Sequence, residues 1–171
     1  MITVDSVIGN INRDKILKKK YDEMSSRNFC ETIKISRLES QRLRLRKSSD
    51  KGTEVALILQ HDMHLKHGDV VMLTENNMVV IEIEPENVLM IEIKENIHEG
   101  DVIEVPARVG HTIGNLHRPI KIERRKIYFP IQADVEFQMF QKLLASISEH
   151  IDIKKTKMVF EPEEGMEMHE H

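Results

Sequence analysis

The chain has 171 residues, of which 40% are hydrophobic and 32% charged, and a net charge of −4. This composition fits one medium or two small soluble domains and argues against a nucleic-acid binder, whose affinity comes from an excess of Lys and Arg. The absence of a ~20-residue apolar run or a signal-peptide pattern, together with a single cysteine at Cys30, predicts a cytoplasmic protein with no membrane association.

Residues 1–84 are predicted to form a small β domain. Polar and apolar residues alternate in Thr32–Ile35 and in Arg42–Arg46, which indicates half-buried strands. The apolar runs Val70–Leu73 and Val79–Ile83 flank Asn76–Asn77. Asn tolerates the left-handed conformation of tight turns, so this segment predicts a hairpin.

Three other segments of the first domain are less regular. Met1 to Ile11 predicts a strand that leads to a turn at Gly9–Asn10. The charged segment Asp14 to Glu23 fits either a short helix or a loop. His61 to Gly68 predicts a loop.

Pro85–Asn87 is the predicted boundary with a second domain, residues 85–160. Val88–Ile93 predicts a strand. Residues 101–115 have apolar positions at helical spacing, with Gly114–Asn115 as a natural end. Pro106 opposes a helix interior there, so this segment stays open between helix and irregular structure.

The rest of this domain predicts a hairpin, a helix and a strand. Ile120–Glu123 and Lys126–Ile131 would pair through a turn, and Asp134 can cap the helix that follows. That helix has an apolar stripe at spacings of three and four, and Lys157–Phe160 predicts the last strand. The order strand, helix, hairpin, helix, strand is that of a ferredoxin-like α+β fold. Residues 161–171 are acidic, rich in Met and His, and predicted to be a flexible tail.

Histidines in two places are candidate metal ligands. His111 and His117 lie in a segment that ends at Pro119, and His169 and His171 lie in the tail. Imidazole suits Ni, Cu and Zn. One His cannot hold an ion alone, but a two-fold axis would bring two copies of His117 together. Surface histidines beside a turn, and a solvated terminus, are the simpler interpretations of these residues.

Other patterns carry weaker functional signals. His61, His64 and His67 would share a face only if their segment were helical, and they lack the paired spacing of structural metal sites. The row Arg42, Arg44 and Arg46 could contact an acidic partner, although such rows are usually solvated. No nucleophile motif, phosphate loop or carboxylate pair indicates an enzyme.

Several segments, in the same order, resemble the UreE family of urease accessory proteins. They are Arg42–Arg46, Gly52–Ala56, Leu65–Val70, Pro85–Leu89, Ile113–Pro119 and Phe160–Gly165. The fifth segment, Ile-Gly-Asn-Leu-His-Arg-Pro, is similar to the family's Gly-Asn-Arg-His-x-Pro signature. The similarity extends over most of residues 1–165.

The resemblance implies a peptide-binding N-terminal β domain and a ferredoxin-like metal-binding and dimerisation domain. It implies a homodimer in which the signature His, here His117, meets its copy at one Ni(II) ion, with Zn(II) or Cu(II) as possible substitutes. His169 and His171 would be auxiliary ligands. It further implies delivery of nickel to the apo-urease assembly complex through the accessory GTPase UreG.

This chain departs from the family pattern in two ways that concern the site. Leu116 replaces the Arg that precedes the metal His, and His111 is one place away from a His that some members carry at the position of Thr112. The alternatives to nickel delivery are a general zinc or copper buffer and a peptide-binding co-chaperone. An RNA-binding role of the arginine row is disfavoured by the acidic charge balance.

Overall fold

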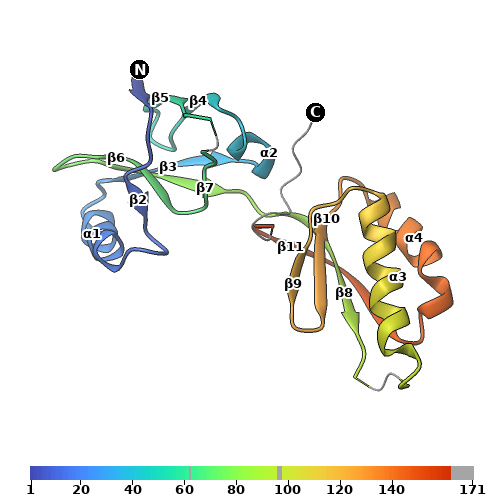
Figure 1. Cartoon of the computed structure of the whole chain (residues 1–171). Helices are drawn as coiled ribbons and strands as arrows, with labels where there is room; N and C mark the ends of the chain where they lie inside the picture. The colour runs from blue at the N-terminus through green and yellow to red at the C-terminus, as the bar shows by residue number, and fades with distance from the viewer. Residues whose placement is uncertain (62, 96–97, 163–171) are drawn as a thin grey trace. The chain divides into compact units, whose positions relative to one another are not determined.

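The computed structural model describes residues 1–61, 63–95 and 98–162, and the chain divides into two compact units. The first is Met1–Glu84, and the second begins at Pro85. Figure 1 shows the elements of both units. Within the described residues, no helix combines the length and the apolar character needed to cross a bilayer.

Two sheets and two helices make up the first unit. One sheet has the order β1-β5-β4, and the other has the order β2-β6-β7-β3. The strands are β1 (Ile2–Val4), β2 (Gly9–Asn10), β3 (Cys30–Ile35), β4 (Arg44–Ser48), β5 (Glu54–Ile58), β6 (Asp69–Leu73) and β7 (Met78–Ile83); the helices are α1 (Lys15–Ser26) and α2 (Arg37–Ser40). The β-rich first domain is therefore confirmed.

Helix α1 decides the question that the sequence left open for Asp14–Glu23. The Asp14 carboxylate accepts hydrogen bonds from the N–H groups of Ile16 and Leu17, at 2.8 and 3.2 Å, and so caps the helix. Its apolar face, which includes the buried Met24, packs into the core beside β6 and β7. Burial of this face stabilises a segment that is otherwise strongly charged.

The strand predicted across Met1–Ile11 is wrong in its extent. Only Ile2–Val4 forms β1, and the expected turn at Gly9–Asn10 is instead the short strand β2, which pairs with Asp69 and Val70. The Asn10 side chain explains this pairing, because its amide donates to the Asp69 carboxylate at 2.8 Å and to the His67 carbonyl at 2.9 Å.

The predicted hairpin between β6 and β7 is confirmed, but the reason given for it is not. Neither Asn76 nor Asn77 has a positive φ. Instead, the Thr74 hydroxyl accepts from the Asn77 N–H at 3.0 Å, and the Thr74 N–H donates to the Asn77 carbonyl at 2.8 Å. The turn is thus closed by a Thr side chain.

Gly68 is a position where the first unit requires glycine. Its φ is +87°, in the left-handed region, and an added Cβ would collide with the Asn12 amide. The neighbouring Asp69 is buried and accepts from the Lys66 N–H at 2.6 Å. The segment Leu65–Val70 is therefore a structural turn whose sequence is fixed by backbone conformation and by buried hydrogen bonds.

A buried carboxylate, Glu31, joins strand β3 to two turns. It accepts hydrogen bonds from the Ser49 hydroxyl and from the Asn77 amide. Burial is the largest single influence and raises the pKa of Glu31, but hydrogen bonds from Ser49, Thr53 and Asn77 favour the ionised form and lower that pKa overall.

The second unit is a four-stranded antiparallel sheet with the order β11-β8-β10-β9, covered on one side by two helices (Figure 1). This is the ferredoxin-like arrangement that was predicted. Its elements are β8 (Glu86–Ile93), α3 (Asp101–Asn115), β9 (Lys121–Glu123), β10 (Lys126–Pro130), α4 (Asp134–Leu143), the 3₁₀ turn η1 (Ala145–Ile147) and β11 (Ile151–Met158).

Alternate residues of the sheet face the helices and form the core of this unit. Leu89, Ile91 and Phe129 are fully buried there, and the ring of Phe129 lies 4.6 Å from that of Phe140 on α4, at an interplanar angle of 53°. From α3, Val105, Val109 and Ile113 pack into the same cluster. These contacts fix α3 on the sheet over most of its length.

Three local predictions for this unit are resolved. Pro106 does not prevent the helix, since α3 runs from Asp101 to Asn115 and Pro106 lies in its first half. Asp134 is not the cap of α4: Ala133 is the N-cap residue, and Asp134 pairs with Lys155 at 2.7 Å. The last strand begins at Ile151 and ends at Met158, earlier than predicted.

Replacing Gly68 by Ala should lower the free energy of unfolding by more than the same change at Gly52. Both glycines have nearly equal φ, +87° and +85°, so both variants incur the left-handed penalty of about 1–2 kcal/mol. Only at Gly68 does the methyl group also meet a side chain, that of Asn12. Urea denaturation measures the difference, and equal losses would contradict the collision.

Glu31 should make the stability of the chain fall in acid. Its folded-state pKa lies below the unfolded value, so its contribution is complete above the ordinary value of 4.5 and is lost as pH falls through the folded pKa. In urea denaturation as a function of pH, Glu31→Gln should be less stable than the wild type at neutral pH. Its free energy of unfolding should also fall less steeply as the solution is made acidic. The exposed-turn variant Glu75→Gln is the control and should follow the wild type.

Candidate metal centre

His117 lies immediately after the C-terminal end of helix α3, in a conformation that is uncommon for its residue type. Its φ is +49°, in the left-handed region. Its N–H donates to the Gly114 carbonyl at 3.0 Å, and the Arg118 N–H reaches the Ile113 carbonyl at 3.5 Å. This is the Schellman pattern of a helix end, in which the left-handed position is usually Gly. Here an imidazole occupies it.

The residues after His117 prevent the helix from continuing and attach the chain to α4. Pro119 disfavours helical geometry at Arg118. The Arg118 guanidinium donates through Nη2 to Glu136 Oε2 at 2.7 Å. The other oxygen of Glu136 accepts from the N–H groups of Gln132 and Ala133, at 2.9 and 3.3 Å, at the start of α4. Backbone bonds on one side and an ion pair on the other therefore constrain the His117 backbone.

The surroundings of His117 suit the binding of a cation from outside the chain. The His117 side chain is exposed, and Leu116 beside it is 37% exposed. The C-terminal end of a helix carries partial negative charge, which favours cations within the last turn. A neutral imidazole there is an available ligand, but one imidazole is too few for a stable site.

His111 lies earlier on the same helix and has a neighbour of its own. It is exposed, and its Nε2 lies 3.0 Å from the amide nitrogen of Asn115, one turn further along. Among the described residues, no group of three or more His, Cys, Asp or Glu side chains is arranged to hold a metal. His169 and His171, the predicted tail ligands, lie outside the described residues.

The weaker candidates from the sequence do not form a site. As predicted, the described residues of the segment with His61, His64 and His67 are not helical. His67 has a structural role, because its Nδ1 accepts the Ile83 N–H at 3.2 Å. In the arginine row, Arg42 precedes β4, and Arg46 pairs with Glu54 at 2.7 Å.

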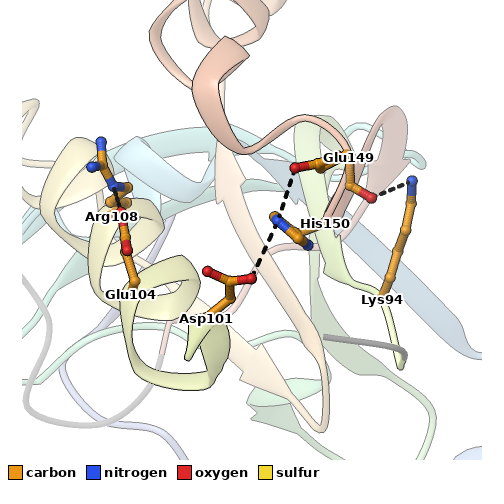
Figure 2. Close-up of polar contacts among 6 residues, drawn as sticks. All are labelled: Lys94, Asp101, Glu104, Arg108, Glu149 and His150. Atoms are coloured by element: carbon orange, nitrogen blue, oxygen red, sulfur yellow. Dashed lines mark hydrogen bonds and ion pairs between the residues drawn. The ribbon is translucent and has the colours of Figure 1, made fainter. Parts of the chain in front are cut away.

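A cluster of polar side chains at the N-terminal end of α3 was missed by the sequence analysis. The His150 Nε2 lies 3.7 Å from an Asp101 carboxylate oxygen and 3.3 Å from one of Glu149, as Figure 2 shows. The Lys94 amine donates to the Glu149 carbonyl at 3.0 Å. No sequence signal connects these residues, because the fold alone brings positions some fifty residues apart together. The cluster links the start of α3 to the segment before β11.

In comparison with known protein families, each of the two units matches a domain of the same family. Residues 4–84 match the N-terminal domain of the UreE urease accessory protein, and residues 81–171 match its C-terminal domain. Proteins named urease accessory protein UreE are similar over 77% of this chain. One from Natronomonas pharaonis is 28% identical over 131 residues, and those from Yersinia pestis and Yersinia pseudotuberculosis are 26% identical over 135. The matched region spans 60% and 57% of these relatives' lengths.

Replacing His117 by Gly should stabilise the chain while removing the candidate ligand. Relief of the left-handed penalty, about 1–2 kcal/mol, exceeds the entropy that Gly adds to the unfolded state, so we expect a gain of ~0.5–1 kcal/mol. The same substitution at His111, inside the helix, should destabilise. Urea denaturation compares the two, and a loss at His117 would mean that the imidazole itself stabilises the fold.

Proposed function

The chain belongs to the UreE family of urease accessory proteins, and from that premise we propose that it is a nickel-binding chaperone, a homodimer in which two copies of His117 share one Ni(II) ion. The relatives are named as accessory proteins of urease rather than as enzymes. In this proposal the ion is the cargo, destined for the active site of apo-urease, and the dimer works in the cytoplasm.

The observation that carries this proposal is the placement of His117. It is an exposed ligand held in a strained backbone conformation at a helix end. Gly is the usual residue at this position of a helix end, so the imidazole that occupies it is a candidate for a functional side chain. Because a two-fold interface places each patch against its own copy, a single imidazole per chain becomes a pair.

The surface of α3 around His117 is open enough for a second copy to approach. Apart from the helix itself, no atom of the described residues lies within 4 Å of a Cβ added at Gly110 or Gly114. At the other end of the helix Ile103 is 82% exposed, which leaves apolar area for an interface. We therefore assign dimerisation and metal binding to residues 85–160.

The ion must be held reversibly if it is to be passed on. We propose that His169 and His171 of the tail, residues 161–171, and His111 supply auxiliary ligands beside the His117 pair. The accessory GTPase UreG would take the ion by replacing the auxiliary ligands first. Since imidazole binds metal only when deprotonated, nickel affinity should fall as pH drops through the His range.

For residues 1–84 we propose binding of peptide or partner protein, with the apo-urease assembly complex as the target. Strand β4 is an edge strand of its sheet and exposes Arg44. An edge strand offers backbone hydrogen-bonding groups to an added strand, and a cationic side chain favours an acidic one.

Nickel titration of the wild type, followed by calorimetry and native mass spectrometry, should give one tightly bound ion per two chains. His117→Gly should remove that ion while leaving the chain folded. His98→Ala, which alters an exposed His that is not among the proposed ligands, is the matched control and should bind nickel as the wild type does. An unchanged affinity and stoichiometry in His117→Gly would refute the shared-imidazole site.

Zinc and copper are expected to compete for the same ligands, because affinity for divalent metals rises toward copper whatever the protein's duty. An assay of nickel delivery to apo-urease distinguishes a nickel chaperone from a general metal buffer. Purified apo-urease should gain activity from the nickel-loaded wild type and much less from nickel-loaded His117→Gly at equal total nickel. Equal gains from both proteins would favour the buffer or the peptide-binding co-chaperone.

A further inference from the structure

An ion pair between Arg118 and Glu136 joins the His117 turn to helix α4. Arg118 adjoins His117 in sequence, and its Nη2 lies 2.7 Å from Glu136 Oε2. Both side chains are largely buried, with 23% and 13% of their surfaces exposed. Solvent screening is therefore weaker than for a surface pair, and the contact is able to restrain the backbone.

Glu136 is itself held in place, so it gives Arg118 a fixed anchor. Its second oxygen accepts from the N–H groups of Gln132 and Ala133, which immediately precede helix α4. One carboxylate thus completes the cap of α4 and receives Arg118. The chain after His117 is therefore held against α4, while the chain before His117 is held by the end of α3.

We propose that Arg118 and Glu136 are positioning residues that keep His117 in its left-handed conformation and thereby set the affinity of the shared nickel site. This inference rests on the proposed function of His117. A left-handed conformation is disfavoured for a residue with a Cβ. The Arg118 N–H bond that closes the turn is long, at 3.5 Å, so the ion pair adds restraint to that of the backbone bonds. If the restraint were lost, the imidazole would point in several directions and binding would have to order it.

The Arg118–Glu136 pair is not an efficient way to stabilise the fold, which supports a positioning role. Arg118 Nε is buried without a hydrogen-bond partner among the described residues. A buried donor left unsatisfied is destabilising, and partly buried ion pairs can often be replaced by apolar residues of similar size at little cost. An Arg in this place therefore contributes more to a defined geometry than to the free energy of folding.

The test uses the full chain with Arg118→Met, Glu136→Gln and the double variant. Glu136→Gln keeps a side-chain oxygen for the N–H groups of Gln132 and Ala133, so α4 can still be capped. The matched control is Arg108→Met, which breaks an exposed pair with Glu104, also 2.7 Å long, on helix α3, after which His117 follows (Figure 2). Each protein is assayed for nickel affinity by calorimetry, for urea stability, and for backbone NMR shifts of metal-free His117.

Each single variant should bind nickel about tenfold more weakly, as expected for residues that orient a metal ligand. The double variant should lose little more than either single variant, because the two residues act through one contact. The His117 Cα and carbonyl shifts should move away from left-handed values before any metal is added. Arg118→Lys should restore part of the affinity, and Arg108→Met should change neither nickel binding nor the His117 shifts.

Left-handed shifts of His117 that persist in the variants would overturn the proposal, whatever happens to stability or affinity. Additive losses in the double variant would also overturn it. Failure of the proposed function has a different signature: His117→Gly would then bind nickel as the wild type does. The shift measurement is made without metal, so it judges the positioning role independently of that result.

Discussion

The end of helix α3 is the constraint on which the candidate site depends. The helix ends at Asn115. Pro119 disfavours helical geometry at Arg118, and the last carbonyls of the helix must be satisfied. The Schellman bonds end the helix and satisfy these carbonyls, and they place residue 117 in the left-handed region. Where most sequences would use Gly, this one has His, so the same bonds that end the helix direct an imidazole outward.

The rigidity of that turn derives from the core of the second unit. Ile113, whose carbonyl accepts from Arg118, is 1% exposed and packs with Val109 against the sheet. Each such side chain stabilises the fold by roughly 1.5–3 kcal/mol when buried, so movement of this last turn would disturb the core. The ligand is therefore anchored to the buried core of its unit, although its own side chain is exposed.

The sequence predicts the helices and strands better than it predicts the long-range contacts that hold them in place. The apolar run Val88–Ile93 and the apolar stripe around Phe140 predict their elements correctly, because both are local signals. Pro106 made α3 uncertain, since the tertiary packing that overrides its cost cannot be seen locally. The anchoring of Arg118 by Glu136 was also missed. Its one local signal, Glu three residues after the N-cap, indicates a capping box but not a distant arginine.

A crystal structure of the nickel-loaded protein, with anomalous scattering recorded at the nickel edge, tests the central claim most directly. The account predicts one strong peak on a two-fold axis, within coordinating distance of the imidazoles of both copies of His117. A peak bound by other residues, or a dimer in which the two imidazoles are too far apart to share an ion, would contradict it.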